Sequence, residues 1–429
     1  MKILFASLPA DGHFNPLTGI ASHLDEQGHD VRWYAGPEYA TKVDRLGMAH
    51  FPYREATEVT GTNLNDLFPE RAGLKGPKQI SFDLEKFFVS QVGAHFADMA
   101  AIRDEFAYDI LFCDGAVYAA HLVAEVLDVP VLAVALASIM PDDEGPPPFF
   151  GLRPARTPVG RIGHRVVRHL LARTTKAGTV RYNEVLAEHG VAPIPLDGFP
   201  HAPLASARRV FLNGSPGLEF PGYRPLPNAE FVGALAPARR VLASDSTQLP
   251  PRVTDGGRKV VVVSQGTVDN SDPGKLIGPT LAALAGSGHV VVATTGGVRT
   301  RELRDRYGSD DAVIEDFFDF DALFRHADVF VTSGGFGSTL AAVGHGVPLV
   351  CAGKREGKSD LNARAGYNGY GIDLRTEHPK PAAVRAAVEK VLADPSYPRR
   401  AAALQVELES YDPMGRIDAV LAGVVAAAR

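Results

Sequence analysis

The segment with the clearest chemical potential is rich in glycine and lies between an apolar, strand-like stretch and a helical pattern. It reads Thr332-Ser333-Gly334-Gly335-Phe336-Gly337-Ser338-Thr339. Three glycines allow the backbone to approach an anion closely. The first amides of a helix that we expect to begin near Ser338 would point at that anion, aided by the helix dipole. The segment predicts a diphosphate-binding loop, and a tight strand-to-helix turn without a ligand is the alternative.

The position of this loop disfavours two other classes of nucleotide-binding enzyme. The loop follows the fourth expected strand of its half of the chain, whereas a dinucleotide fingerprint lies at the first strand-to-helix turn. The first turns here, 8–16 and 264–270, lack Gly-x-Gly-x-x-Gly, and a Walker loop is also lacking. A dehydrogenase and a Walker-type kinase therefore fit the sequence poorly.

A second candidate for chemistry is His13, in Gly12-His13-Phe14-Asn15-Pro16. Because proline suits the first turn of a helix, we expect His13 to lie in the loop just before the helix, after the first strand. A histidine that titrates near neutral pH can remove a proton from an attacking hydroxyl. A lone histidine is more often structural, and the chain has 14 of them.

A candidate partner for His13 is Asp114. It directly follows the apolar run 110–113, so it too lies at the carboxyl end of an expected parallel strand. A carboxylate there could hold the second ring nitrogen of His13 and stabilise the imidazolium, the orienting role seen in catalytic triads. A helix N-cap is the alternative role for Asp114. Asp109 lies at the opposite end of the strand and is a poorer candidate.

The elements that must position these residues fall into two similar halves. Short apolar runs alternate with helical patterns, which predicts parallel strands with right-handed crossovers. We expect strands at 3–8, 31–35, 110–113, 129–136, 209–212 and 230–232, and then at 259–264, 289–294, 312–317, 329–332, 347–351 and 371–374. The predicted fold class is α/β, with two doubly wound Rossmann-like domains that face a central cleft.

The expected domain boundaries follow the irregular segments. Residues 1–235 form the first domain, 236–257 a linker, 258–410 the second domain and 411–429 a closing helix. Two long irregular stretches, 56–77 and 142–160, interrupt the first domain. Phenylalanines in and near them, with Phe82, Phe88 and Phe149 as candidates, could line a pocket for an apolar molecule. Ordinary core packing is the alternative for these rings.

Composition excludes further classes. The net charge is −6 and the pI is near 6.2, so a basic footprint for nucleic acid is lacking. Cys113 and Cys351 lie in apolar runs and are expected to be buried thiols. The N-terminal apolar run is too short for a signal peptide, and the longest apolar stretch falls short of the roughly 20 residues of a membrane span, so we expect a cytoplasmic protein. Asp319-Phe320-Asp321 is more typical of helix capping than of a metal site.

Taken together, these motifs resemble the inverting nucleoside-diphosphate-sugar glycosyltransferases, the family that contains bacterial antibiotic and macrolide glycosyltransferases and plant secondary-metabolite glycosyltransferases. The resemblance spans nearly the whole chain and is most specific in Gly12-His13-x-Asn15-Pro16 and in 331–348. It implies the two-domain GT-B fold, a cytoplasmic location, and chemistry that needs neither a metal nor a cofactor. A nucleoside-diphosphate sugar would be the co-substrate.

The resemblance also implies roles for individual residues. His13 matches the family's catalytic base, and Asp114 matches the aspartate that pairs with it. The residues expected to contact the diphosphate, the second donor loop and the nucleobase are Gly266, Thr267, Phe317, Phe318, Ser333, Gly334, Gly335, Gly337, Ser338 and Thr339. Phe82, Phe88 and Phe149 would contact the acceptor.

Three departures from the family pattern concern the donor site. Ser333 replaces the family's histidine before the double glycine, and Ala341 replaces the acidic residue that usually holds the ribose. The Asp-Gln pair that grips sugar hydroxyls would fall at positions 358 and 359. Glu356, Lys358 and Asp360 are instead the candidates for contacts to the sugar or the phosphates. Loss of the ribose-binding acid is compatible with a dTDP-sugar, and UDP-sugars stay equally open.

The sequence therefore predicts an inverting hexosyltransferase that moves a sugar from a UDP- or dTDP-sugar to a hydroxyl of a small, partly apolar acceptor such as a natural product. His13, oriented by Asp114, would remove the hydroxyl proton. One alternative is a nucleotide-sugar epimerase or hydrolase on the same fold. The other is a non-catalytic nucleotide-sugar-binding or helper protein, which would bind the donor or a partner without transferring sugar.

Overall fold

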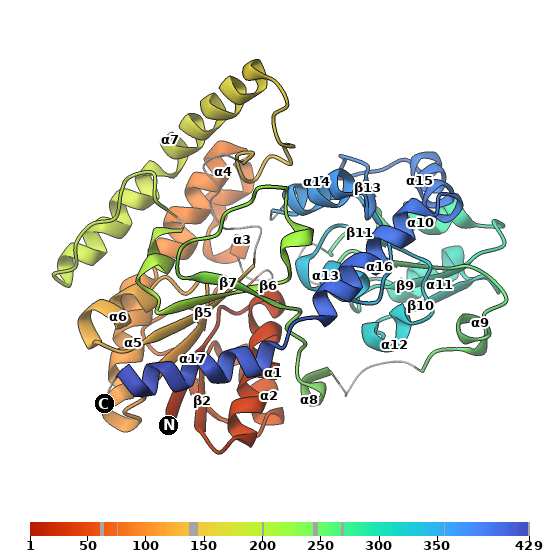
Figure 1. Ribbon diagram of the computed structural model, residues 1–429. Helices are drawn as coiled ribbons and strands as arrows, with labels where there is room; N and C mark the ends of the chain where they lie inside the picture. Colours follow the sequence, from red (N-terminus) through yellow and green to blue (C-terminus); the bar gives the residue numbers. More distant parts are fainter. Residues whose placement is uncertain are drawn as a thin grey trace.

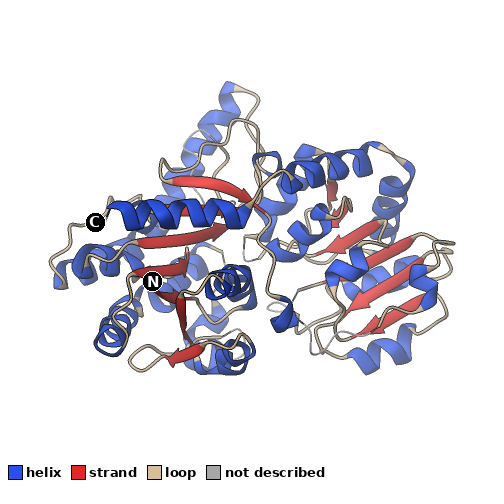
Figure 2. Ribbon diagram, turned by 60° about the horizontal axis from the view of Figure 1, so that its bottom comes forward, coloured by secondary structure: helices blue, strands red, loops and turns tan. Residues whose placement is uncertain are grey.

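A computed structural model describes residues 1–60, 64–74, 76–136, 145–199, 201–242, 248–266, 270–355 and 357–427. Two α/β units lie side by side, each built on one parallel sheet (Figure 1). The predicted fold class is confirmed. The central strands are apolar and buried because helices cover both faces of each sheet (Figure 2). The strand β8 (Val260–Ser264), for example, has four consecutive valines, and all five of its residues are buried.

The N-terminal sheet has seven strands in the order β3-β2-β1-β4-β5-β6-β7. They are β1 (Lys2–Ala6), β2 (Asp30–Ala35), β3 (Ala49–Pro52), β4 (Ile110–Asp114), β5 (Val131–Leu136), β6 (Arg209–Asn213) and β7 (Ala229–Gly233). Strand β3 lies outside the predicted set because it is an edge strand in which only Phe51 is buried, so it has no apolar run. The strand order reverses between β1 and β4, and ligands of such sheets bind at the carboxyl ends of the strands there.

The C-terminal sheet has six strands in the order β10-β9-β8-β11-β12-β13. With β8 they are β9 (Val290–Thr294), β10 (Ala312–Glu315), β11 (Val329–Thr332), β12 (Leu349–Cys351) and β13 (Gly371–Asp373). All six correspond to predicted strands. The order reverses between β8 and β11, so the loops after these two strands flank the second crevice.

Helices and short helical turns connect the strands. The α-helices are α1 (Asp11–Glu26), α2 (Ala40–Arg45), α3 (Leu64–Leu67), α4 (Pro77–Phe82), α5 (Val92–Glu105), α6 (Ala120–Leu127), α7 (Pro158–Glu188), α8 (Arg239–Leu242), α9 (Pro251–Thr254), α10 (Ile277–Leu284), α11 (Thr300–Tyr307), α12 (Phe320–Phe324), α13 (Phe336–Gly344), α14 (Lys358–Asn368), α15 (Pro381–Ala393), α16 (Ser396–Glu409) and α17 (Pro413–Ala427). The turns η1 (Pro37–Tyr39), η2 (Pro69–Gly73), η5 (Ala202–Ser206) and η6 (Pro216–Leu218) are 3₁₀-helical, and η3 (Asp83–Val89) is a π-helix. Within the described ranges, no helix is long and apolar enough to cross a membrane.

The expectation that His13 lies in a loop before the first helix is wrong. Helix α1 begins at Asp11, so His13 lies in its first turn, and Pro16 lies inside the helix. The N–H of His13 already donates to the carbonyl of Ala10, and the carboxylate of Asp11 suits the positive end of the helix dipole. Proline marks a helix start only as a tendency, and here the helix begins five residues earlier.

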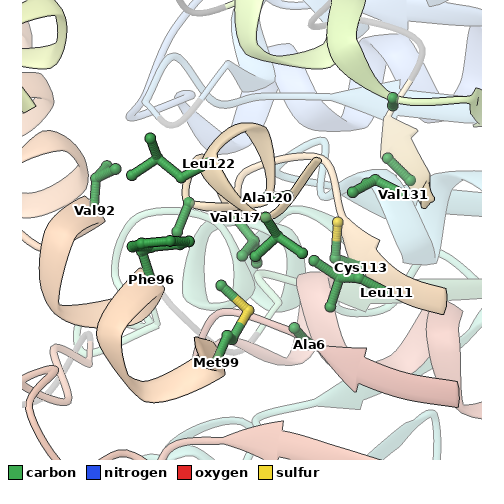
Figure 3. Packing of buried hydrophobic residues seen from close by; sticks show 14 of the residues in the cluster. Ala6, Val92, Phe96, Met99, Leu111, Cys113, Val117, Ala120, Leu122 and Val131 are labelled. Carbon is green, nitrogen blue, oxygen red and sulfur yellow. The ribbon is translucent and has the colours of Figure 1, made fainter. Parts of the chain in front are cut away.

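One of the two core clusters of the N-terminal half lies between the sheet and helices α5 and α6. Figure 3 shows Phe96 of α5 beside Leu122 of α6, and Met99 of α5 near Ala6 of β1, in the same buried cluster as Leu111 and Cys113 of β4. The prediction that both cysteines are buried thiols is confirmed, since Cys113 and Cys351 are buried and form no disulfide. This packing fixes the position of α5 relative to the end of β4.

The chain returns to its N-terminal half at the end. Helix α17, dark blue in Figure 1, runs along the N-terminal unit although it follows the second sheet in sequence. Its residues Ile417, Leu421 and Val424 are buried in the same cluster as Phe5 of β1 and Leu17 of α1. The last helix therefore ties the second half of the chain to the first.

Buried polar contacts also join the two halves. Arg364 of α14 donates from Nε to Oε2 of Glu219, at 2.5 Å, and their side chains are only 9% and 2% exposed. Asp360 of the same helix accepts the N–H groups of Phe149 and Gly151, at 2.5 and 2.7 Å. A charge that is removed from water in this way depends on its partner for stability.

Loss of one partner of the Arg364–Glu219 pair should destabilise the protein. Arg364→Met leaves the Glu219 carboxylate buried without the guanidinium charge, which costs about 3–5 kcal/mol of unfolding free energy. The double variant Arg364→Met/Glu219→Leu removes both charges and should recover most of that loss. Urea unfolding followed by circular dichroism measures both variants. A single variant as stable as the wild type would show that this pair does not hold the halves together.

Candidate active site

Asp114 joins the loops that follow two adjacent strands, β1 and β4. Its Oδ2 accepts the N–H of Leu8 at 2.9 Å, and its Oδ1 accepts the N–H of Ala116 at 2.7 Å. Oδ1 also lies 2.9 Å from Nδ1 of His13. The structure thus brings the two predicted catalytic residues into contact. The alternative role of Asp114 as a helix N-cap is wrong, because the helix that follows, α6, begins at Ala120 with Ala119 as its N-cap.

The bonds around Asp114 decide which nitrogen of His13 carries the proton. Each oxygen of Asp114 already accepts a backbone N–H, so the carboxyl group is also the acceptor in its third bond. Nδ1 of His13 is therefore the donor in that bond. In neutral His13 the lone pair then lies on Nε2. The His13 side chain is 28% exposed and that of Asp114 is 6% exposed, so the imidazole reaches the surface while its partner stays buried.

Opposing effects act on the pKa of His13. Burial is the largest single effect and lowers this pKa, but the charge of Asp114 and its hydrogen bond together outweigh burial, so the pKa lies above the ordinary 6.5. A raised pKa makes the neutral imidazole a better proton acceptor. The pair can therefore take a proton from a hydroxyl and hold the resulting imidazolium beside a carboxylate.

The predicted anion loop lies between β11 and α13. Gly335 immediately precedes the helix, which begins at Phe336. Gly334 has a φ of +94°, and a Cβ there would lie 2.1 Å from Oδ1 of Asn362, so only glycine fits. A Cβ on Gly337 would meet nothing within 4 Å, so the first helical turn is open. The amides at this helix start lack intrahelical acceptors, and the helix dipole adds positive charge, which suits an anion.

Ser333 holds this loop in place. Its Oγ donates to the carbonyl of Gln265 at 2.9 Å, and its side chain is buried. Asn362 donates from Nδ2 to the carbonyls of Ser333 and Gly353, at 3.3 and 3.0 Å. The glycine loop is thus tied to the segments that follow β8 and β12. Because the hydroxyl proton of Ser333 is committed to the main chain, this residue does not replace the family's histidine as a donor to phosphate.

Three other residues expected to contact the donor lie at accessible positions. Ser338 is half-buried, and its Oγ donates to the carbonyl of Gly335 at 3.2 Å. Phe317 is 43% exposed. Gly266 has a φ of +80° and open space at its Cβ position. These residues can meet a ligand without rearrangement of the core.

The remaining candidates for donor contacts are buried or lie outside the described residues. Thr339, Phe318 and Lys358 are buried, and Phe318 belongs to the core of the C-terminal half. Thr267 and Glu356 lie outside the described residues. Of the pair Phe317 and Phe318, only the first is therefore placed to pack against a nucleobase.

Two aspartates with candidate ligand roles have structural partners. The carboxylate of Asp360 is used by the N–H groups of Phe149 and Gly151. Asp319 is the N-cap of α12 and accepts the N–H of Asp321 at 2.9 Å, as the capping interpretation predicts. Among the described residues, no group of three or more His, Cys, Asp and Glu side chains could hold a metal ion.

A pocket opens beside the His13–Asp114 pair. Its walls come from the loops after β1 and β4 and from the junction of η3 with α5, and it is lined by Leu8, Pro9, Tyr53, Thr57, Val59, Phe87, Phe88, Gln91, Val92, His95, Ala116, Val117, Tyr118 and Ala119. The amides of Leu8 and Ala116 are the ones that hold Asp114. Leu8 and Ala116 thus connect the pocket to the pair, although neither His13 nor Asp114 lines it, and the volume of the pocket is about 20 Å³. π-Helical segments such as η3 are rare and often lie at functional sites.

Of the three phenylalanines predicted to contact an acceptor, only Phe88 lines this pocket. Phe82 packs edge-on against Phe68, with ring centroids 6.0 Å apart. Phe149 has a φ of +74°, and α14 holds it through its main-chain N–H and carbonyl. Neither Phe82 nor Phe149 lines this pocket, and their contact with an acceptor stays a prediction.

Sequence reasoning missed the polar and aromatic lining of the pocket. Tyr53 and Tyr118 come from two separate loops, while Gln91 and His95 lie one turn apart at the start of α5. They meet where α5 packs beside α6 and the loops that follow β3 and β4. Local pattern therefore gives no signal for them.

The amino-acid sequence of the chain is similar to those of known proteins. Residues 281–415 match the family model described as "Erythromycin biosynthesis protein CIII-like, C-terminal domain". Over an alignment of 429 residues the chain is 31% identical to 4'-demethylrebeccamycin synthase of Lentzea aerocolonigenes, and the alignment covers 98% of each chain. The similarity thus extends through both halves of the protein.

Solved structures share the fold. The glycosyltransferase of kitacinnamycin superposes with a TM-score of 0.71 at 20% identity, over 98% of both chains. The glycosyltransferase SsfS6 of Streptomyces sp. SF2575, complexed with thymidine diphosphate, gives a TM-score of 0.67 at 17% identity, over 98% of this chain and 99% of that one. The arrangement of two parallel-sheet units is the GT-B fold.

The close packing around the glycine loop leads to a stability prediction. Gly334→Ala would place a methyl group against Asn362 at a positive φ, which costs about 1–3 kcal/mol. Gly337→Ala, three residues away and inside α13 with open space at its Cβ position, should not lower stability and should raise it by up to about 1 kcal/mol. Thermal unfolding without ligand compares the two variants. Equal melting temperatures would show that the loop does not depend on Gly334 in this way.

Proposed function

Because the chain belongs to the nucleoside-diphosphate-sugar glycosyltransferase family that includes bacterial natural-product glycosyltransferases, we propose that it transfers a sugar with inversion to a small, partly apolar acceptor. The donor is a UDP- or dTDP-sugar, and the acceptor group is a hydroxyl. The observation that carries this proposal is the 2.9 Å contact of His13 with Asp114 beside an aromatic-lined pocket. A neutral imidazole held by a buried carboxylate is the kind of base that such a transfer needs.

The proposed reaction is a single displacement. Nε2 of His13 takes the proton of the acceptor hydroxyl while the oxygen attacks the anomeric carbon from the face opposite the diphosphate. The new carbon–oxygen bond forms as the bond to the diphosphate breaks, and the diphosphate leaves with the electron pair of that bond. The proton remains on the imidazole, where Asp114 stabilises the positive charge. A single attack from the opposite face inverts the anomeric configuration.

We assign the diphosphate to the glycine loop. The amides at the start of α13 and the helix dipole offset the charge that develops on the leaving group, without a change in their own orientation. Ser338 lies in the same turn and is half-buried, and its hydroxyl can contact the diphosphate if it turns away from the carbonyl of Gly335. In this scheme neither a metal nor another cofactor is required. The thymidine diphosphate bound by SsfS6 supports a dTDP-sugar, and Ala341 is compatible with a donor whose ribose makes no acidic contact.

The pocket beside His13 is the proposed acceptor site. Its rings include Tyr53, Phe87, Phe88 and Tyr118, which offer flat apolar faces on which an aromatic or polyketide molecule can stack. The similarity to 4'-demethylrebeccamycin synthase supports a natural product as the acceptor. The charged residues of the chain lie elsewhere than on these walls, so a highly charged acceptor would fit poorly.

Replacement of His13 tests the proposed function. His13→Ala should lower transfer from UDP-glucose or dTDP-glucose to phenolic acceptors by about 10²–10⁴-fold, because the proton has no acceptor in the attack. Nucleotide affinity should change little, since the glycine loop is separate from His13. In the wild type, transfer should fall as the pH drops through the raised pKa of His13, because the protonated imidazole cannot act as a base. Product formation is measured by chromatography with mass detection.

A matched control is His378→Ala, which removes an exposed histidine of the C-terminal half and should leave transfer unchanged. A His13→Ala enzyme with ordinary turnover would contradict the proposal. Donor consumption by the wild type without any acceptor would instead favour an epimerase or hydrolase. Donor binding with neither transfer nor consumption would favour the helper-protein alternative.

A further inference from the structure

The long helix α7 carries a concentration of exposed apolar side chains. Of the eleven large apolar side chains that are exposed among the described residues, five lie on this helix. They are Val159, Ile162, Val166, Leu170 and Val180, with exposed fractions of 78, 57, 53, 54 and 39%. Single exposed apolar residues are common on protein surfaces, whereas a contiguous group indicates a contact surface.

The spacing of four of these residues places them on one line. Val159, Ile162, Val166 and Leu170 follow one another at intervals of three, four and four positions, so they share one face of the helix. We call this line the apolar stripe. At a rise of about 1.5 Å per residue, it runs for about 16 Å along α7. The helix, yellow to light green in Figure 1, follows the outer edge of the N-terminal unit.

The other face of α7 holds the helix against the protein. Its buried residues begin at Thr175, and α7 packs there on α4 and η3. Gly178 allows a close approach, since a Cβ at this position would lie 2.8 Å from the side chain of Leu84 in η3. Between Pro158 and Thr174, all of which the structure describes, no residue is buried. The N-terminal part of α7 therefore presents the stripe to solvent.

The same segment carries charge of one sign. From 150 to 183 the sequence has no Asp or Glu, and it has the cations Arg153, Arg156, Arg161, Arg165, Arg168, Arg173, Lys176 and Arg181. The whole chain, in contrast, has a net charge of −6. Arg161, Arg165, Arg173 and Lys176 are exposed, and none of these four forms an ion pair with another described residue. We call these four residues the flanking cations.

The flanking cations lie beside the stripe or extend it. Arg165 directly precedes Val166, so it lies about 100° around the helix from the stripe, and Lys176 lies three turns further on the same flank. Arg173 lies one turn beyond Leu170, where the line of the stripe continues. Long cationic side chains can lay their stems along an apolar surface while their charged ends stay in water. An apolar line edged with cations is typical of a helix that lies on an anionic lipid surface.

Other occupants fit this surface less well. A second copy of the chain would bring the flanking cations of both molecules together across a symmetry axis, where like charges repel. A stable protein interface takes about 20–30 residues from each partner, whereas the stripe consists of four aliphatic side chains. Because α7 is not apolar enough to cross a membrane, a lipid surface would meet it along its side.

We propose that the N-terminal part of α7 is a docking surface for an anionic lipid membrane. The helix lies parallel to the surface, with the stripe inserted among the headgroups and the flanking cations beside the lipid phosphates. Both parts are needed, because the cations are attracted by the surface charge and the stripe then removes apolar area from water. The inference concerns where the protein binds and does not depend on the proposed sugar transfer.

Cosedimentation of the full-length protein with lipid vesicles tests this inference. Phosphatidylcholine vesicles that contain about 30% phosphatidylglycerol should bind the protein at least about tenfold more strongly than vesicles of phosphatidylcholine alone, since the lipid charge attracts the flanking cations. An increase in NaCl from about 0.1 M to about 0.5 M should weaken this binding by about tenfold, because salt screens the attraction.

Two variants separate the charge from the stripe. Arg161→Gln/Arg165→Gln/Arg173→Gln/Lys176→Gln removes the flanking cations and should weaken binding to the charged vesicles by at least about tenfold. Ile162→Gln/Val166→Gln/Leu170→Gln keeps the charge and should weaken this binding by a similar factor, because it removes the apolar contact. Glutamine favours helix, so α7 should stay intact in both variants. Melting temperatures check this, and if one variant is not folded, the other decides.

The matched control removes the same number of charges elsewhere. Arg252→Gln/Arg301→Gln/Lys390→Gln/Arg399→Gln replaces four exposed cations of the C-terminal half and changes the net charge by the same amount as loss of the flanking cations. Its binding to the charged vesicles should stay within about threefold of the wild type, since only the cations beside the stripe face the lipid.

Lack of wild-type binding to the charged vesicles would overturn the inference, and so would binding that both α7 variants retain. A wild-type dimer that the stripe variant loses, without vesicle binding, would assign the surface to a second copy. Binding to soluble polyglutamate, again without vesicle binding, would indicate an acidic protein partner. Sugar transfer to phenolic acceptors is measured without lipid, so failure of the proposed function would be seen in that assay and not with the vesicles.

Discussion

The rest of the site depends on the three hydrogen bonds of one buried carboxylate, that of Asp114. It binds the amides of Leu8 and Ala116 and the imidazole of His13, with distances of 2.7–2.9 Å. One charged group thereby fixes the loops after β1 and β4, the tautomer of the base and one wall of the pocket. A buried carboxylate is costly unless its acceptor sites are filled, so the same bonds that stabilise the charge also position the chemistry.

In the C-terminal half, the proposed anion site consists of main-chain amides at the start of α13. Its glycine loop is held from behind by Ser333 and Asn362, and the open side of the first turn of α13 is left to an anion. The two halves then have to face each other in a fixed manner. Asp360 and Arg364 of α14 provide this through contacts to main-chain and side-chain groups of the N-terminal half. The proposed base, acceptor pocket and anion loop are thus positioned by buried polar contacts.

Much of the fold could be predicted because buried parallel strands have continuous apolar runs, such as the valines of β8. His13 and Asp114 could be paired because both follow strands of one sheet. Pro16 misled the placement of His13, since proline inside a helix and proline at its start look alike in sequence. The contacts of His95 could not be predicted, because they depend on partners such as Tyr34, which lies 61 residues away. Phe149 likewise depends on a helix more than 200 residues away.

The most direct test of the central claim is the protonation state of His13, measured by ¹⁵N NMR of histidine-labelled protein, with the His13 signals assigned by their loss in His13→Gln. We expect the neutral ring to carry its proton on Nδ1 and to titrate above the ordinary 6.5. Because its pKa is raised in the folded state, His13 should add stability that is present below the unfolded pKa and is lost as the pH rises through the folded one. A neutral ring protonated on Nε2, or a pKa below 6.5, would contradict the assignment of His13 as a base held by Asp114.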